Sequence, residues 1–202
     1  MTDAPPIVRR KPRVDHAARR TEYVGIAARV FLDKGLHSAT MRDIAEAAGA
    51  AKVLFYRLFP SREALVAAVF ERVEQAIDEA YDQPWDGYGS MVAKVLETAR
   101  KDPAPFLVVF KNCRASQPEW ETRLRAVLGR VSMPLFIPGP DAPAGAEARA
   151  RKAAGALFGL FLDSMVTWLE DRDGLTDEER IRWWGRIVRE NRAAGREAFR
   201  LD

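Results

Sequence analysis

The stretch TMRDIAEAAGAAKVLFYRLFPSREAL (40–65) decides how the N-terminal part of this chain folds. Its pattern predicts two short helices, over 40–48 and 51–58, that cross closely over a preceding helix. Ala45 supplies the small side chain needed where the helices approach most closely, and Gly49 tolerates the positive φ of the turn. The other inward positions carry Ile44, Ala48, Ala50, Phe55 and Leu58. This spacing predicts a helix-turn-helix, in which one short helix enters the major groove of DNA.

The flanking residues continue the helical pattern in both directions. Apolar side chains recur at three- and four-residue spacing from Tyr23 to Phe31, and Lys34-Gly35 ends this first helix. Further helices are expected over about 61–81, 90–101, 104–115, 118–134, 145–171 and 176–199. The sequence contains no alternating strand pattern and no internal repeat, so the predicted fold class is all-α.

Basic and acidic residues are distributed unevenly between the helix-turn-helix segment and the rest of the chain. Up to Arg62 there are 12 basic and 6 acidic residues, whereas the remainder has 20 basic and 23 acidic ones. A basic head on a slightly acidic body is typical of a nucleic-acid-binding protein. We expect a disordered basic arm over 1–14, a helix-turn-helix domain over 15–60 and a helical domain over 61–202.

The composition indicates a globular protein of the cytoplasm. Hydrophobic residues make up 48% of the 202 residues, which is enough for a sizeable core. The first twenty residues are too charged for a secretory signal, and Asp163 interrupts the longest apolar stretch, so no membrane partner is expected. The single cysteine, Cys113, excludes an internal disulfide and fits a reducing compartment.

The stretch over 40–65 closely resembles the DNA-binding segment of TetR-type (tetracycline-repressor-like) transcriptional regulators. The matching residues are Thr40, Ile44, Ala45, Ala48, Gly49, Tyr56, Phe59, Ser61, Glu63 and Leu65, with Arg62 in place of the usual lysine. Residues 27–40 also fit the first helix of that family and the glycine that ends it.

The resemblance implies roles for six residues in contact with double-stranded DNA. The helix over 51–58 would lie in the major groove, with Lys52 and Tyr56 facing phosphates and base edges. Thr40 and Arg62 would hold phosphates on either side of it, and Arg42 would contact a base or a phosphate. Leu54 would lie at the same DNA-facing edge.

The DNA-facing edge departs from the family pattern at three positions. Family members usually have a capping serine at position 51, followed by glycine and a hydroxyl residue at 53 and 54. This chain has Ala51, Val53 and Leu54 instead. Loss of the cap costs a helix about 1 kcal/mol. The two apolar residues either read thymine methyl groups or weaken DNA binding, and the sequence leaves both possibilities open.

For the C-terminal domain, the resemblance implies a homodimer that binds a palindromic operator and a small effector. The last two helices would pair with their symmetry mates in a four-helix bundle, and Gly155 and Gly159 would permit the close approach. Repression, with release by an apolar or aromatic effector, is the expected mode.

Aromatic and sulfur-bearing residues of the central helices are the candidates for the effector site. They are Met91, Phe106, Phe110, Trp120, Met133, Phe161, Met165 and Trp168, each of which could instead fill the core. Asn112, Arg114 and Asp163 are nearby polar residues that could orient a ligand.

Two other classes of protein remain as alternatives. An architectural DNA-binding protein would have the same head but no effector. An all-α enzyme is less favoured, because His16 and His37 lie in or next to the head and no nucleophile pattern surrounds them. The sequence also lacks a GxSxG motif and any cluster with metal-ligand spacing, so no catalytic residue, metal or cofactor is predicted.

Overall fold

The computed structural model describes residues 16–112, 118–171 and 173–200, apart from the side chains of residues 118–121, 124, 125 and 128. These ranges contain nine α-helices, one 3₁₀ helix and no strand, which confirms the all-α class. The elements are α1 (His16–Lys34), α2 (Met41–Ala47), α3 (Lys52–Leu58), α4 (Arg62–Tyr81), α5 (Ser90–Lys101), α6 (Pro103–Asn112), α7 (Pro118–Val131), η1 (Met133–Phe136), α8 (Ala146–Leu169) and α9 (Asp177–Phe199). The predicted arm over 1–14 lies outside the described residues, as do Cys113 and Arg114.

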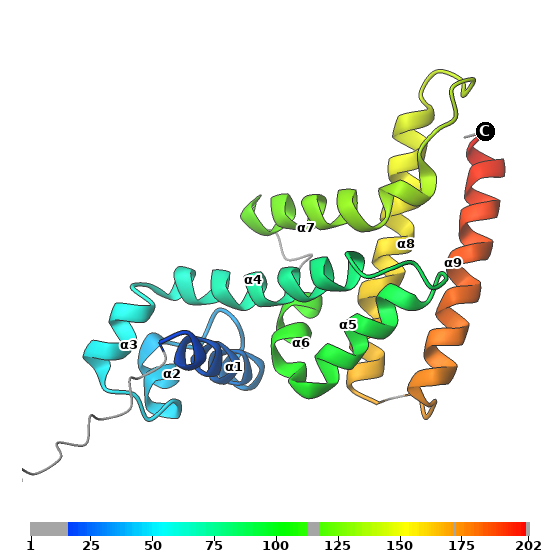
Figure 1. Cartoon of the computed structure of the whole chain (residues 1–202). Coiled ribbons are helices and arrows are strands. Elements are labelled where there is room, and N and C mark those ends of the chain that lie inside the picture. Colours follow the sequence, from blue (N-terminus) through cyan, green and yellow to red (C-terminus); the bar gives the residue numbers. More distant parts are fainter. Residues whose placement is uncertain (1–15, 113–117, 172, 201–202) are drawn as a thin grey trace, which may run out of the picture.

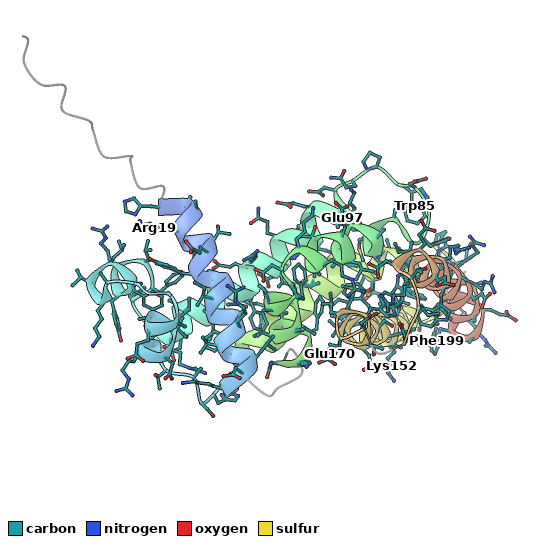
Figure 2. All side chains as sticks on the ribbon, turned by 90° about the horizontal axis from the view of Figure 1, so that it is seen from below. Arg19, Trp85, Glu97, Lys152, Glu170 and Phe199 are labelled. Atoms are coloured by element: carbon teal, nitrogen blue, oxygen red, sulfur yellow. The ribbon has the colours of Figure 1, made fainter. Side chains whose placement is uncertain are left out.

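The helices form an elongated molecule with α1, α2 and α3 at one end and α8 and α9 at the other (Figure 1). Helix α4 runs from the first group into the second, with α5 and α6 on one side of it and α7 on the other. Helix α1 packs against both α4 and α6, so the head contacts the body at two places. Figure 2 shows Arg19 at the head end and Trp85 and Phe199 at the opposite end.

The head is held together by the small and apolar positions that the sequence pattern singles out. Phe55 is fully buried, and its ring lies 5.7 Å from that of Tyr23 and 5.7 Å from that of Phe59. Ala45 is buried where α2 meets its neighbours, and Gly49 has a φ of 56° in the turn between α2 and α3. The helix-turn-helix scaffold is therefore present as predicted.

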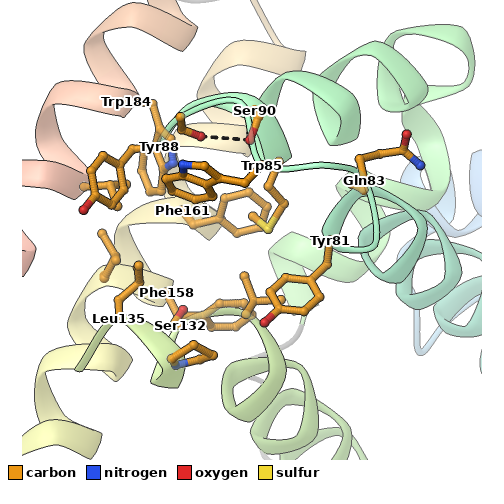
Figure 3. A pocket seen from close by; sticks show the side chains of 17 residues that line it. Tyr81, Gln83, Trp85, Tyr88, Ser90, Ser132, Leu135, Phe158, Phe161 and Trp184 are labelled. Carbon is orange, nitrogen blue, oxygen red and sulfur yellow. Dashed lines mark hydrogen bonds between the residues drawn. The ribbon is translucent and has the colours of Figure 1, made fainter. Parts of the chain in front are cut away.

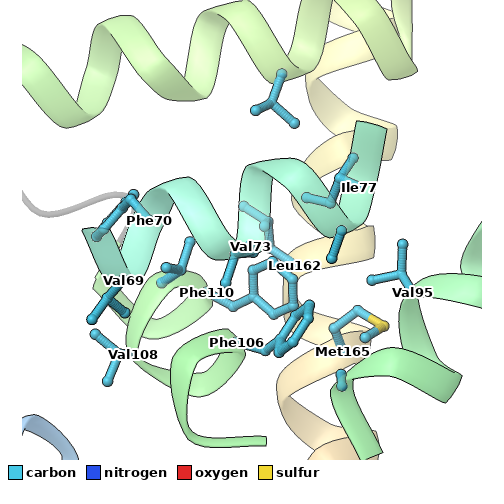
Figure 4. Close-up of a cluster of buried hydrophobic side chains, with 14 of the residues drawn as sticks. Val69, Phe70, Val73, Ile77, Val95, Phe106, Val108, Phe110, Leu162 and Met165 are labelled. Atoms are coloured by element: carbon cyan, nitrogen blue, oxygen red, sulfur yellow. The ribbon is translucent and has the colours of Figure 1, made fainter. Parts of the chain in front are cut away.

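The body has a continuous apolar core between α4, α5, α6 and α8 (Figure 4). Val69, Val73 and Ile77 project from α4 into this core. They face residues of the other three helices, among them Val95, Phe106, Phe110, Leu162 and Met165. Full burial of one such side chain contributes about 1.5–3 kcal/mol, so this cluster fixes the second half of α4 in the body.

The structure corrects one predicted helix. The stretch over 118–134, expected to be continuous, ends as an α-helix at Val131 and is followed by η1. Pro134 explains the break, because proline has no N–H to donate and disfavours α conformation in the residue before it. The short turn buries Phe136 completely.

Helix α8 is the one helix among the described residues that is long and apolar enough to cross a membrane. Its most apolar window is 56% buried inside the protein. A buried core helix meets the same length and composition criteria as a membrane span.

The turn between α8 and α9 is organised around a buried arginine. Only 2% of Arg180 is exposed, and its guanidinium donates to Asp171 and Asp177 at 2.7 Å each and to Asp173 from Nε at 3.1 Å. Arg100 of α5 donates to the same Asp177 at 2.8 Å. Arg180 holds the pKa of Asp173 below its ordinary value, and Arg100, followed by Arg180, does the same for Asp177. These charges tie α5, α8 and α9 together.

Replacing Arg180 by alanine should destabilise the protein by about 3 kcal/mol at pH 7, because Asp171 and Asp173 lose their arginine partner and Asp177 keeps only Arg100. The lowered pKa values mean that the ionic contribution is present at neutral pH and is lost as the pH falls below about 4. Urea unfolding at several pH values should therefore show the difference from the natural chain shrinking in acid. Arg182→Ala, at an exposed position of the same helix, is the control. An equal loss at all pH values would mean that packing, not charge, dominates.

Candidate DNA-binding surface and ligand cavity

Helix α3 buries one side and presents the other to solvent. Phe55 anchors it in the head, and Lys52, Val53, Tyr56 and Arg57 are exposed. The rings of Tyr56 and Phe55 are nearly perpendicular, with their centroids 6.2 Å apart, so the tyrosine packs on the core while nearly half of it stays accessible. The outward side of α3 thus combines two cations, an aromatic hydroxyl and one apolar side chain.

Thr40 has a structural role that fixes the start of α2. Its hydroxyl accepts from the N–H of Asp43 at 3.2 Å and donates to the Asp43 carboxylate at 2.6 Å. Lys34 of α1 donates to the other carboxylate oxygen at 2.8 Å, and mainly for that reason the pKa of Asp43 lies well below its usual range. The cap orients α2 relative to α1, while the phosphate contact of Thr40 stays a prediction.

Arg62 also turns out to be bound within the head. Its guanidinium donates to the carbonyl oxygens of Leu36 and Ala39, the latter at 3.3 Å, and lies 6.0 Å from the centre of the Phe31 ring. Its side chain is 27% exposed, so it joins the start of α4 to the loop before α2. A guanidinium has five N–H donors, which leaves the predicted phosphate contact compatible with this role.

Arg42 is more accessible than Arg62. Its side chain is exposed on α2, and its ion pair with Glu46, one turn later, has an N–O distance of 3.8 Å. A pair this long and exposed is weak, so the guanidinium can be redirected toward DNA at little cost.

The two apolar departures from the family pattern differ in exposure. Val53 is 84% exposed, whereas Leu54 is half-buried against the head. Leu54 is predicted to lie at the DNA-facing edge, but Val53 is the more exposed of the two. The assignment followed the order of residues in the motif, which does not show how α3 is rotated on its support.

A cavity of about 400 Å³ lies in the body, at the end of α4 remote from the head (Figure 3). It is enclosed by the last residues of α4, the loop over 82–89, the first turn of α5, η1, α8 and α9. Figure 3 shows Trp85, Tyr88 and Trp184 on one side of it, with Phe158 and Leu135 on the other. The lining residues are Ala80, Tyr81, Gln83, Trp85, Gly87, Tyr88, Ser90, Met91, Val131, Ser132, Pro134, Leu135, Leu157, Phe158, Phe161, Trp184 and Val188.

The cavity is neutral and mostly apolar. Every described side chain that lines it is uncharged, and its polar groups are hydroxyls, the indole N–H groups of two tryptophans and one amide. The Ser90 hydroxyl donates to the Gly87 carbonyl at 2.8 Å, which fixes the loop rather than leaving a free donor. Burying a charge without a partner is costly, so the lining favours an uncharged ligand.

Trp85 stands at the mouth of this cavity. It is 69% exposed, and its ring meets the Tyr88 ring edge-on at 5.1 Å. Arg189 of α9 lies 6.0 Å from the other ring of this pair, that of Tyr88. The aromatic pair therefore connects the loop over 82–89 to α9.

Residues 26–69 match the family model described as "Bacterial regulatory proteins, tetR family". The matched segment includes all of α2 and α3 and the first part of α4. The head of this chain is that of a TetR-family regulator. The resemblance seen in the sequence is thereby confirmed, and with it a role in DNA binding and regulation of transcription.

Similarity to named transcriptional regulators extends over most of the chain in one relative and over a shorter segment in another. The chain is 28% identical over 173 residues to the transcriptional activator FasR of Mycolicibacterium smegmatis, covering 81% of this chain and 78% of that protein. It is 46% identical over 50 residues to the transcriptional repressor KstR2 of Rhodococcus jostii, covering 25% and 24% of the two chains.

Solved structures share the fold of both parts of the molecule. A putative transcriptional regulator from Pseudomonas aeruginosa superimposes with a TM-score of 0.61 at 17% identity, covering 94% of this chain and 97% of that one. A TetR-like regulator from a Rhodococcus species gives a TM-score of 0.60 at 18% identity, covering 91% and 98%. At these identities the likeness concerns the fold alone.

The structure brings only part of the predicted ligand-binding set to the cavity. Met91 and Phe161 line it. Five predicted residues do not: Phe106, Phe110 and Met165 are buried in the core, Trp168 packs against Trp183 and Trp184, and Met133 lies half-buried in η1. The side chain of Trp120 lies outside the described residues.

The polar candidates also lie elsewhere. Asn112 donates to the carbonyl of Val108 at 2.8 Å, and Asp163 is exposed on α8.

Sequence reasoning missed the residues that close the cavity. Tyr81, Trp85 and Tyr88 lie in the segment YDQPWDGYG (81–89), which the helical pattern treats as a break. Trp85 and Tyr88, which lie among proline and glycine residues, were a usable signal. Large aromatic side chains stabilise a loop only when they pack against another element. Phe158 and Trp184 carried no such signal, since buried faces of α8 and α9 look alike in sequence.

Helix α3 begins without a side-chain cap, because Ala51 occupies the N-cap position with an extended backbone. Ala51→Thr should stabilise the protein by about 1 kcal/mol relative to Ala51→Val, because the threonine hydroxyl can accept from a free N–H of the first turn. The two variants have the same shape and differ only in that hydroxyl, so urea unfolding isolates the cap. Equal stabilities would mean that the first turn of α3 is already satisfied by water.

Proposed function

We propose that this chain is a homodimeric repressor that binds a palindromic operator and is released by a neutral, mostly apolar small molecule. Its role as a TetR-family regulator is the established part, and the dimer, the operator symmetry and the effector are the proposal. The observation that carries it is the uncharged cavity at the far end of α4, the helix whose other end supports the recognition helix.

In this proposal, α4 couples the ligand in the cavity to the head. Tyr81 is the last residue of α4 and lines the cavity, so a ligand contacts the helix directly. Arg62, the first residue of the same helix, is bonded to the loop before α2. A ligand that favours one position of α4 therefore favours one placement of α3. Release follows if operator and effector prefer different positions.

The outer faces of α8 and α9 support the dimer. Trp183 is 42% exposed beside Leu160, which is only half-buried, and Leu175 is exposed in the preceding turn. A Cβ added to Gly155 would meet no atom within 4 Å, so nothing in the described part of the protomer explains a glycine there. A second copy packed on these helices would cover this apolar area and hold two recognition helices about 34–36 Å apart.

Repression is the mode we propose, and the similar proteins include both an activator and a repressor. The similar FasR is named an activator and the similar KstR2 a repressor. The cavity favours an effector-controlled regulator over an architectural DNA-binding protein, which would need no such space. It also offers no charged or nucleophilic pair among its described residues on which an enzyme could rely. The cytoplasm is the compartment we propose.

Combining Lys52→Ala with Tyr56→Phe should weaken operator binding on the order of a hundredfold, because each half-site loses two hydrogen-bonding groups. Gel shifts and fluorescence anisotropy measure the binding, and sedimentation velocity checks that the dimer persists. Lys101→Ala, an exposed lysine of the body, is the control. Undiminished binding by the double variant, or equal affinity of the natural chain for any duplex, would contradict specific operator binding.

Met91→Lys should abolish the thermal shifts that neutral apolar compounds cause, because it brings a charge into the uncharged cavity. Met91→Leu keeps the volume and the apolar character and should retain them. Compounds that stabilise the natural chain are then tested for release of the operator duplex. Unchanged shifts in the lysine variant would place the ligand elsewhere, and shifts without release would contradict the effector role.

A further inference from the structure

Val53 is the most exposed of the large hydrophobic residues among those the structure describes, at 84%. It is the second residue of α3 and lies in the first turn of that helix. Tyr56 and Arg57 follow it at three- and four-residue spacing, so they share its face of the helix. A single apolar side chain therefore stands among polar groups on the surface that faces DNA.

Nothing within the described part of the chain accounts for a valine at this position. Its methyl groups bury almost no area, so they add little to the core. Valine also disfavours helix relative to alanine, since its branched Cβ restricts χ1. In a helix of seven residues without a side-chain cap, that preference is not offset locally. Val53 therefore adds little to the stability of the free protein, and a favourable contact of its side chain would have to form in a complex.

We propose that Val53 reads the 5-methyl group of a thymine in each half-site of the operator. This inference rests on the proposed operator binding. In a helix-turn-helix, residues of the first turn of the recognition helix meet base edges in the major groove. Thymine is the base that displays a methyl group there, and apolar contact is the way proteins detect it. The stiff χ1 of valine presents its methyl groups in one direction, so little freedom is lost on contact.

The neighbouring side chains fit a division of labour around this contact. Lys52 precedes Val53 and Tyr56 lies one turn later, and both are exposed for phosphates or polar base edges. Leu54 is half-buried against the head and is therefore a poorer reader than Val53. In this proposal, the valine at position 53, where the family pattern has glycine, contributes to operator specificity and does not weaken DNA binding.

The test starts from a pool of random duplexes enriched for binding by the full chain. We expect the enriched sites to share a T·A pair at one symmetric position. Deoxyuridine, which differs from thymidine only by the methyl group, is then substituted at each thymine in turn. At that position binding should weaken roughly fourfold for one half-site and roughly fifteenfold for both, the effect of removing about one methyl contact each.

Variants at position 53 assign the effect to this side chain. Val53→Ala should bind thymine and deoxyuridine duplexes almost equally, whereas Val53→Thr, which keeps one methyl group, should retain part of the preference. Circular dichroism and sedimentation check folding and assembly, which so exposed a position should not disturb. Enrichment with no methyl-dependent thymine, or an undiminished preference in Val53→Ala, would overturn the assignment alone. A pool that shows no enrichment would overturn sequence-specific operator binding and the assignment together.

Discussion

The organisation of this protein depends on one helix, α4, whose apolar face is buried along its whole length but in two different surroundings. Leu65, near the start of α4, is fully buried beside the helix-turn-helix, and Val69, Val73 and Ile77 are buried in the core of the body. An apolar face that is packed at both ends cannot move at one end without disturbing the other, because close-packed interiors do not deform freely. The position of α3 is thus coupled to the packing of the body.

The far end of that helix is the place of the proposed effector site. The cavity begins at the last turn of α4 and is closed by a loop and by α9, so its contents contact three elements at once. Its aromatic and aliphatic walls provide contact area, and the lack of charge on its described side chains selects against ions. The ion cluster around Arg180 lies at the α8–α9 turn, where Asp177 of α9 also accepts from Arg100 of α5.

The sequence predicted the elements well and the cavity poorly, for a physical reason. Helix boundaries and the helix-turn-helix follow from local signals, such as the cap at Thr40, the turn at Gly49 and the spacing of Ile44 and Phe55. Which aromatic faces a cavity depends on how helices distant in sequence rotate against each other, so Phe106 and Met91 looked equivalent although only Met91 lines the space. In the same way, the rotation of α3 on its support decides that Val53 is exposed and Leu54 is half-buried.

The double packing of α1 has a consequence for how such regulators can be recombined. Because α1 lies against both α4 and α6, the DNA-binding head is not a cassette that ends with α3. A chimera joined between α3 and α4 would place a foreign α1 on the apolar faces of α4 and α6 and mismatch both contacts. Exchange of operator specificity between relatives is therefore easier by resurfacing α3 in place than by grafting a complete head.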